Sequence, residues 1–513
     1  MSIVQCLSVT APPPSLQDNT ADLDRLKRVV LETMGGTDMP LVVPWRVAGS
    51  VARRFRQAGF SGAAIVNRVE GRIELVDFLA TVPAVLPAMA LDLGTTYLEA
   101  TLVDLLTGAQ LARAHCPNGQ IRFGDDILSR IHAAGRGSGL ADLRQAVISS
   151  INELAGRLAA QAGGTGEEIR ALSVSGNPTM VHLLLGLDPH HLCREPYIPL
   201  VNAPDMASAA ELGLALNPMA PVFVLPGVGS YFGGDLIAGI LASGLDRQDE
   251  TAMLIDVGTN AEVVLGNREW LIACAGAAGP ALEGGVARMG MRAGPGAIEH
   301  IAIDPATLEV TWQTIDDRPA CGLCGSGIID LVAALYLARI IDARGKFRPG
   351  SDPARLKAAG EVLAYTVVPA DEAAEGRAVV LEQVDLDALM RSKAAMYAVL
   401  STLVAQVGID FGDLHRIYVA GAFGRHIDPR RAITLGMLPD LPLTMYQPIG
   451  NSSLAGAEMV LTDDSARQRC RRIMQAITYV ELNVNQEFMM RFSGAKFIPH
   501  TNHGLFPSVP VFD

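Results

Sequence analysis

The sequence predicts an α/β protein whose two lobes are built on duplicated mixed sheets, preceded by a linker and a small α/β domain. Two matching stretches predict the duplication. An apolar strand runs into Asp92-Leu-Gly-Thr-Thr and leaves by a second strand, and the same pattern returns at Asp256-Val-Gly-Thr-Asn. The length agrees, because 513 residues exceed one ordinary domain.

Each of these strand–turn–strand units is typical of a phosphate-binding site. Glycine lets the backbone approach a ligand closely, and consecutive N–H groups in a turn form a concavity that binds anions. A carboxylate repels bare phosphate, so Asp92 and Asp256 indicate a cation, most simply Mg²⁺ held through water molecules. The backbone positions expected to hold phosphate are Gly94, Thr95 and Thr96 in the first turn and Gly258, Thr259 and Asn260 in the second.

Composition and charge exclude several classes of protein. Hydrophobic residues make up 49% of the chain and charged residues 19%, as in a folded protein with a large core. The formal net charge of −13 disfavours a general nucleic-acid-binding protein, which needs clustered Lys and Arg. No apolar run reaches the roughly 18 residues of a membrane-spanning helix, and the first residues do not form a signal peptide. We therefore expect a cytoplasmic protein with no nucleic-acid or membrane partner.

The seven cysteines are dispersed along the chain, at positions 6, 116, 193, 274, 321, 324 and 470. This odd, scattered set predicts neither a disulfide framework nor a structural zinc site. A ferredoxin-type cluster needs four close cysteines, so no bound iron–sulfur cluster is expected. Cys321 and Cys324 form a C-x-x-C motif that is either a redox pair or simply two loop cysteines.

Four segments are predicted along the chain. Residues 1–39 are expected to be a Pro-rich linker with a short amphipathic helix, and residues 40–84 a small α/β middle domain with a hairpin turn at Glu70-Gly71. Residues 89–247 are expected to form the first lobe and residues 248–513 the second. A long helix is expected over residues 139–161.

Three more turns follow predicted strands and are candidates for ligand contact. Asp235 ends a glycine-rich turn, where its carboxylate either caps a helix or faces a metal-bound water. The Ser175-Gly-Asn turn is either ligand-facing or a plain strand-to-helix turn. The stretch from Gly421 to Gly424 follows a strand at 416–420 and suits an adenosine platform. No G-x-x-x-x-G-K-S/T motif occurs, which excludes a Walker-type ATPase.

This order of motifs resembles the superfamily of actin, sugar kinases and heat-shock ATPases (ASKHA), in which two lobes clamp ATP. The resemblance implies that Asp92 and Asp256 face each other across a cleft and hold Mg²⁺ through water. It also implies that Asp235 or Glu262 orients an attacking water.

The finer motifs together resemble the reductive activators of corrinoid proteins, from about Ser15 to His500. They are D-L-G-T-T at 92–96, N-G-Q at 118–120, F-G-D-D-I-L-S-R-I at 123–131, S-G-N-P-T-M-V-H-L-L-L-G-L at 175–187, D-V-G-T-N-A-E at 256–262, A-A-G-P-A-L-E-G at 277–284, G-M-R-A-G-P-G-A-I at 290–298, C-G-S-G-I-I-D at 324–330 and V-A-G-A-F-G at 419–424. In that family ATP hydrolysis drives the return of an inactive Co(II) corrinoid to Co(I). The resemblance therefore implies a homodimeric ATP hydrolase that acts on the corrinoid protein of a methyltransferase system.

The chain departs from that family at its start. The usual members begin with a plant-type [2Fe–2S] ferredoxin domain, whereas this sequence starts at what resembles their linker. If the activity is retained, a separate ferredoxin or flavoprotein is expected to supply the electron. Ser326, beside Cys324, is a candidate for contacting the corrinoid partner.

Two other functions stay open. The first is a small-molecule kinase on the same fold, with Asp235 as its catalytic carboxylate. The second is a non-catalytic, nucleotide-gated chaperone or scaffold for a methyltransferase system.

Overall fold

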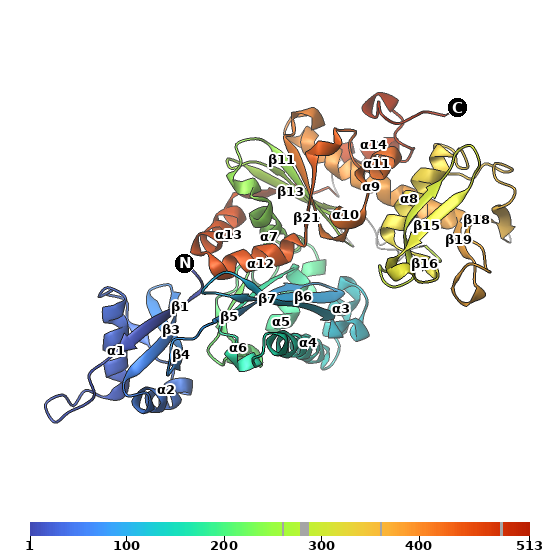
Figure 1. Ribbon diagram of the computed structural model, residues 1–513. Coiled ribbons are helices and arrows are strands. Elements are labelled where there is room, and N and C mark those ends of the chain that lie inside the picture. Colours follow the sequence, from blue (N-terminus) through green and yellow to red (C-terminus); the bar gives the residue numbers. More distant parts are fainter. Residues whose placement is uncertain (259–260, 277–286, 360–361, 483–485, 513) are drawn as a thin grey trace. The chain divides into compact units, whose positions relative to one another are not determined.

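The computed structural model describes residues 1–512 except 259–260, 277–286, 360–361 and 483–485. The chain forms two compact units. Unit 1 comprises Met1–Ala242 and Ser453–Gln475, and unit 2 comprises Ser243–Ser452 and Ala476–Asp513. In both units helices cover the faces of β-sheets (Figure 1).

Unit 1 begins with a small α/β domain, drawn in blue in Figure 1. Its four-stranded sheet has the order β1-β3-β4-β2. The elements are β1 (Val4–Thr10), α1 (Asp22–Thr33), β2 (Leu41–Val42), α2 (Trp45–Gln57), β3 (Ser61–Val69) and β4 (Arg72–Leu79). Leu26 and Val30 of α1 and Val51 and Phe55 of α2 are buried at helical spacing, so each helix packs an apolar stripe into the domain core.

The predicted linker over residues 1–39 is wrong in its first part. Residues 4–10 form β1, which pairs antiparallel with β3 from Val4 opposite Asn67 to Thr10 opposite Ser61. The Pro run at 12–14 predicts extended chain, but the strand before it is short and shows only weak alternation. The short amphipathic helix is confirmed as α1.

A buried charge network fastens the small domain to the rest of unit 1. Asp77 of β4 is 5% exposed. Its Oδ2 accepts hydrogen bonds from Arg170 Nε at 3.0 Å and Asn217 Nδ2 at 3.3 Å, and its Oδ1 lies 2.8 Å from Arg54 Nη2. Arg170 and Asn217 lie outside the small domain and are themselves buried. Because separating buried charges is costly, these contacts hold the small domain in one position.

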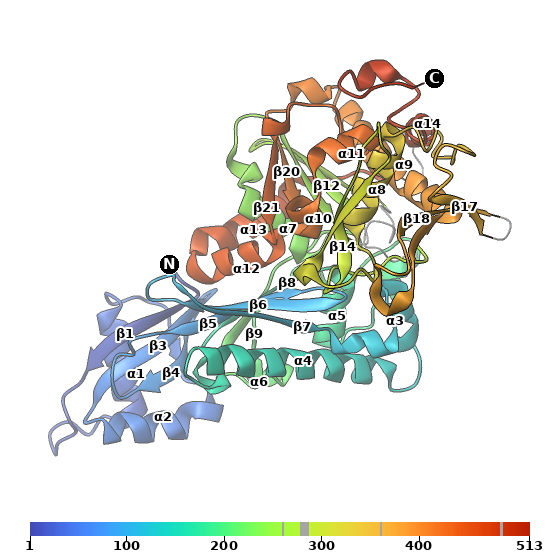
Figure 2. The same cartoon turned by 45° about the vertical axis from the view of Figure 1, so that its right-hand side comes forward.

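The rest of unit 1 is built on a six-stranded sheet of order β7-β6-β5-β8-β10-β9. Its strands are β5 (Pro87–Leu93), β6 (Tyr97–Asp104), β7 (Gln110–Pro117), β8 (Leu172–Gly176), β9 (Ala207–Ser208) and β10 (Pro221–Val224). Its helices are α3 (Ile127–Ala134), α4 (Gly139–Gln161), α5 (Pro178–Leu185), α6 (Ala209–Leu212), α7 (Gly234–Ser243), α12 (Ser452–Thr462) and α13 (Asp464–Ala476). The helix predicted over residues 139–161 is confirmed as α4, which runs along the sheet in Figure 2.

Unit 2 is built on a second six-stranded sheet, of order β21-β20-β11-β12-β13-β22. Its strands are β11 (Ala252–Val257), β12 (Ala261–Gly266), β13 (Leu271–Gly276), β20 (Arg416–Ala420), β21 (Tyr446–Gly450) and β22 (Ile477–Tyr479). Two three-stranded sheets accompany it, β15-β14-β16 and β17-β18-β19. Their strands are β14 (Ala297–Ile303), β15 (Val310–Thr314), β16 (Gly322–Leu323), β17 (Leu356–Ala359), β18 (Val362–Val368) and β19 (Val379–Glu382).

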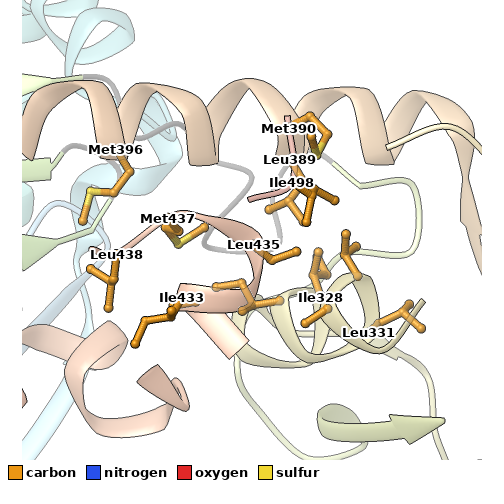
Figure 3. Close-up of a cluster of buried hydrophobic side chains, with 14 of the residues drawn as sticks. Ile328, Leu331, Leu389, Met390, Met396, Ile433, Leu435, Met437, Leu438 and Ile498 are labelled. Atoms are coloured by element: carbon orange, nitrogen blue, oxygen red, sulfur yellow. The ribbon is translucent and has the colours of Figure 1, made fainter. Parts of the chain in front are cut away.

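The helices of unit 2 meet in an apolar core. They are α8 (Gly325–Leu337), α9 (Gln383–Gln406), α10 (Gly421–His426), α11 (Pro429–Leu435) and α14 (Gln486–Gly494). Figure 3 shows side chains of α8, α9 and α11 pointing toward one another, including Ile328, Leu389 and Ile433. Ile498, near the C-terminus, joins the same cluster. Within the described residues, every helix falls short of the length and apolarity that crossing a membrane requires.

The two large sheets repeat one topology, which confirms the predicted duplication of mixed sheets. β5 pairs antiparallel with β6 and parallel with β8. In the same way, β11 pairs antiparallel with β12 and parallel with β20. A long helix precedes the parallel strand in each case, α4 before β8 and α9 before β20.

The predicted second lobe, unbroken from 248 to 513, differs from the structure because Ser453–Gln475 returns to unit 1. The contacts that hold this segment join residues far apart in the sequence. A Cβ at Gly456 of α12 would lie 2.4 Å from the Cα of Ala238 in α7, and Ser173 Oγ donates to Ala457 O at 2.6 Å. Pairings over such separations leave no local sequence pattern.

We expect Asp77→Ala to lower the free energy of unfolding by about 3–5 kcal/mol, because it leaves Arg170 as a buried charge without its carboxylate. Glu74→Ala removes a more exposed partner, that of Arg72 on the same strand, and should cost less than about 1 kcal/mol. Urea denaturation followed by circular dichroism measures both. Equal losses in the two variants would contradict the anchoring role of Asp77.

Candidate functional site

Asp92 stands at the carboxyl end of β5, a central strand of the large sheet in unit 1. It lies opposite Glu99 on β6 and opposite Ser175 on β8. Glu99 pairs with Arg113 at 2.7 Å. Asp92 itself is partly exposed, so a ligand at this edge of the sheet can reach its carboxylate.

A serine from a distant part of the chain fixes the orientation of Asp92. Ser453, in the first turn of α12, donates from Oγ to Asp92 Oδ1 at 2.7 Å. The same Oγ lies 2.9 Å from Ser175 Oγ. Both serines are buried, so the contact is shielded from water and holds the carboxylate in one rotamer.

Two asparagines hold the turn from Gly94 to Thr96. Asn118 Nδ2 donates to Gly94 O at 2.9 Å, and Asn177 Nδ2 donates to Thr95 Oγ1 at 3.1 Å. Asn177 also caps α5, because its Oδ1 accepts from the backbone N–H of Met180 at 3.0 Å. The Ser175-Gly-Asn turn therefore both begins a helix and braces the predicted phosphate turn.

Asp235 lies in the first turn of α7, at the same edge of the sheet. Its Oδ1 accepts from the backbone N–H of Leu236 at 2.9 Å, and the residue is partly exposed. Gly233 brings this loop against the β8–α5 turn, since a Cβ there would lie 2.5 Å from Asn177 Cα and 2.7 Å from Asp235 Oδ1. Asp92, Asn177 and Asp235 thus stand together at the ends of β5, β8 and β10.

Unit 2 repeats this arrangement with different partners. Asp256 lies opposite Glu262 on β12 and opposite Ala420 on β20, and both carboxylates are partly exposed. Gly421 follows with φ +71°, and a Cβ there would lie 3.1 Å from Asp256 Oδ1. Directly opposite residues of paired strands point to one face, so Asp256 and Glu262 share a side of the sheet.

The predicted phosphate-binding positions of unit 2 are Gly258, Thr259 and Asn260, which follow β11 in the sequence. Gly258 comes directly after the strand and is partly exposed. Thr259 and Asn260 lie outside the described residues, as does the A-A-G-P-A-L-E-G motif at 277–284.

The two glycines of the predicted adenosine platform have different surroundings. Gly421 borders Asp256, whereas a Cβ at Gly424 would lie 2.1 Å from Val419 O. The absence of a side chain at Gly424 is therefore required for α10 to pack against its own strand.

Arg425 is a candidate that the sequence analysis missed. Its Nη2 would lie 3.5 Å from a Cβ at Gly450, the last residue of β21, so the guanidinium reaches the end of the neighbouring strand. It is exposed and makes no hydrogen bond or ion pair with the residues that the structure describes. A guanidinium at this edge suits an anionic ligand such as phosphate.

His182, on α5, serves packing. It is buried, its Nδ1 lies 2.7 Å from Pro178 O, and its Nε2 accepts from the backbone N–H of Leu200 at 3.1 Å. Burial lowers the pKa of this imidazole. Both ring nitrogens have backbone partners, as expected of a structural histidine.

The two cysteines of the C-x-x-C motif differ in their exposure to solvent. Cys321 is exposed, with Sγ 3.6 Å from Met291 Sδ. Cys324 is buried, with Sγ 3.2 Å from both Ile298 O and Ser326 Oγ. Both are free thiols. Ser326, the candidate for partner contact, is 6% exposed, so a partner would reach it only after α8 or its preceding turn moved.

The donors at the two sheet edges fit Mg²⁺ and a nucleotide. Carboxylates beside hydroxyl and amide groups suit a magnesium ion that keeps most of its water ligands. Across the described ranges, no group of three or more His, Cys, Asp or Glu side chains suits a metal held by protein ligands alone.

The duplicated sheets with a carboxylate at each central strand end define an ASKHA-like α/β protein. The C-terminal domain of RACo, its ASKHA domain, matches residues 250–510, and the RACo middle region matches residues 87–248. The chain belongs to the RACo family. The segment predicted as a middle domain, 40–84, precedes the part that matches the family's middle region.

Three known proteins extend the similarity over most of the chain. The corrinoid activation enzyme RamQ of Eubacterium limosum is 31% identical over 498 residues, which cover 95% of this chain and 82% of RamQ. A Co(II) methylated amine-specific corrinoid protein reductase of Methanosarcina barkeri is 25% identical over 422 residues, covering 76% of this chain and 72% of that protein. The solved structure of a reductive activator for corrinoid, iron-sulfur protein matches with a TM-score of 0.89 at 37% identity, covering 99% of this chain and 81% of that one.

We expect Ser453→Ala to raise the Kd for Mg-ATP about tenfold, because a hydrogen bond to a charged group contributes about 1.5–3 kcal/mol and orients Asp92. Isothermal titration calorimetry measures the affinity. Ser401→Ala is the control, since it removes another buried hydroxyl, one that bonds Ala398 O within α9. Unchanged affinity in Ser453→Ala would remove Asp92 from the nucleotide site.

We expect Gly421→Ala to weaken Mg-ATP binding, because the added Cβ crowds Asp256 Oδ1. Gly408→Ala is a matched control: its φ is +72°, nearly that of Gly421, but nothing lies within 4 Å of its Cβ position. Both variants should lose about 1–2 kcal/mol of stability from the left-handed backbone alone. If the two variants bound Mg-ATP equally well, Gly421 would not belong to the site.

Proposed function

We propose that this protein hydrolyses Mg-ATP to return an inactive Co(II) corrinoid protein to the Co(I) state. The observation that carries the proposal is the similarity to RamQ, a corrinoid activation enzyme, over 95% of the chain. Asp92, held by Ser453 at the end of β5, supports the nucleotide part of the proposal. The corrinoid protein would belong to a methyltransferase system.

Residues at the ends of β5 and β11 would together bind ATP and Mg²⁺. Bound Mg²⁺ neutralises phosphate charge and acts as a Lewis acid. Asp92 and Asp256 would hold its water ligands. Backbone N–H groups would hold the phosphates, at Gly94, Thr95 and Thr96 in unit 1 and at Gly258, Thr259 and Asn260 in unit 2.

Two carboxylates are candidates for orienting the attacking water. Asp235 supports this role by its place near Asn177, and Glu262 by its place opposite Asp256. Gly421 would leave room for the nucleoside, and Arg425 would contact phosphate.

The reduction itself needs one electron, and we propose that a separate ferredoxin or flavoprotein supplies it. Co(II) gains this electron and becomes Co(I), while the carrier is oxidised. ATP-driven conformational change would displace an axial ligand of cobalt in the partner and so raise the Co(II)/Co(I) potential. We further propose that the protein works as a homodimer in the cytoplasm.

The direct test mixes the protein with a Co(II) corrinoid methyltransferase protein, Mg-ATP and titanium(III) citrate as reductant. The Co(I) absorbance should appear only with ATP, and the corrinoid protein should stimulate ATP hydrolysis. Hydrolysis that the corrinoid protein leaves unchanged would contradict the proposal. ATP consumption that depends on a small alcohol would favour a kinase, and binding without turnover would favour a scaffold.

We expect Asp92→Asn and Asp256→Asn each to lower the rate of Mg-ATP hydrolysis about a hundredfold or more, because metal-based stabilisation of the transition state amounts to several kcal/mol. Both variants should keep the wild-type melting temperature within a few degrees. Asp371→Asn changes an exposed carboxylate in a turn and should hydrolyse ATP normally. Normal turnover in either site variant would overturn that residue's assignment.

A further inference from the structure

The outer face of α2 presents a tryptophan among arginines. Trp45 is 91% exposed. The helix carries four arginines, at positions 46, 53, 54 and 56, and no acidic residue. At about 100° per residue, Trp45, Arg46, Arg53 and Arg56 lie within an arc of about 100°. The opposite side of the helix packs into the small domain's core.

Two of these arginines, unlike Arg56, form no ion pair with the part of the chain that the structure describes. Arg56 donates to both carboxylate oxygens of Asp22 at 2.8 Å. Arg46 and Arg53 are exposed and make no hydrogen bond or ion pair with the described residues. The pKa of Glu211 is lowered. The main cause is its hydrogen bonds from Ser208, and the positive charge of Arg46 lowers it further by a smaller amount.

This positive face stands on an otherwise acidic protein. Residues 1–84 hold nine of the 41 basic residues but only eight of the 54 acidic ones, so the excess of negative charge lies in the rest of the chain. Tryptophan and arginine are enriched where proteins bind one another, and an exposed tryptophan gains by being covered. Charge complementarity then selects an acidic partner.

We propose that the α2 face, defined by Trp45, Arg46 and Arg53, docks the acidic one-electron carrier protein that supplies the electron for corrinoid reduction. This inference rests on the proposed function and names the place where its electron donor binds. The docked carrier gives up one electron and Co(II) becomes Co(I).

The position of the face favours the carrier over the corrinoid protein. The small domain contributes none of the candidate nucleotide-binding residues, and the contacts of Asp77 hold it firmly to unit 1. Electron transfer depends steeply on distance, so a carrier needs a fixed platform. The corrinoid protein, in contrast, would under the proposed function contact the parts whose conformation ATP changes.

The test measures Co(I) formation with reduced [2Fe–2S] ferredoxin of strongly negative charge, and separately with titanium(III) citrate. In Arg46→Glu/Arg53→Glu the KM for ferredoxin should rise about tenfold at low ionic strength, and the wild-type KM should rise with salt. Trp45→Ser, at an exposed position, should also raise this KM. Titanium-driven reduction and ATP hydrolysis should stay at the wild-type level.

Arg68→Glu/Lys357→Glu is the matched control, because it makes the same change of charge at exposed positions on other elements, β3 and β17. An unchanged ferredoxin KM in the α2 variants would overturn the inference. So would a loss of titanium-driven reduction, which would assign the face to the corrinoid protein, or a change in sedimentation coefficient, which would assign it to self-association.

Failure of the wild-type protein with titanium citrate would count against the proposed function instead. Direct binding of oxidised ferredoxin to the wild-type protein and the variants, by biolayer interferometry, then decides the docking inference alone. Equal binding by all variants would overturn it.

Discussion

The hydrogen bond from Ser453 to Asp92 is the contact on which the candidate site of unit 1 depends. Asp92 ends a strand of a buried sheet, and a carboxylate there needs a fixed donor to keep one orientation. That donor comes from α12, which the chain reaches only after it has built most of unit 2. Ser453 also contacts Ser175 at the end of β8. The orientation of Asp92 is therefore fixed only once α12 has packed onto unit 1.

The two large sheets place different residues around their central aspartates, Asp92 and Asp256. In unit 1 the glutamate opposite the central aspartate, Glu99, is paired with Arg113. In unit 2 the glutamate in this position, Glu262, shares one face of the sheet with Asp256. The strand that runs parallel to the central one leads to Asn177 in unit 1 and to Gly421 in unit 2. The duplication thus gives both units the same strand arrangement. The residues that follow the strands differ: unit 1 has a polar side chain, Asn177, where unit 2 has Gly421, which has no side chain.

Local patterns made the hairpins at Asp92 and Asp256, the duplicated sheets and α4 predictable from the sequence, because strand alternation, turn glycines and helical spacing all act over a few residues. Ser453 was not predictable as the partner of Asp92, since 361 residues separate them. The strand at 4–10 was hidden by the Pro run after it, and its pairing with β3 depends on residues some 50 positions away. Exposure also depends on residues that are distant in the sequence. Trp45 begins an ordinary amphipathic helix, and only the packed domain shows that its side chain is 91% exposed.

Buried polar contacts anchor the small domain to the rest of unit 1. Arg170 and Asn217 converge on Asp77 from outside the small domain, so separating it from unit 1 would strip buried charges of their partners. A domain anchored in this way cannot act as a swinging arm. It can only present a surface at a constant position, and the surface it presents is α2 with Trp45 and its arginines. Under the proposed function, nucleotide-dependent motion would arise elsewhere in the protein, and the small domain would keep a fixed place on unit 1.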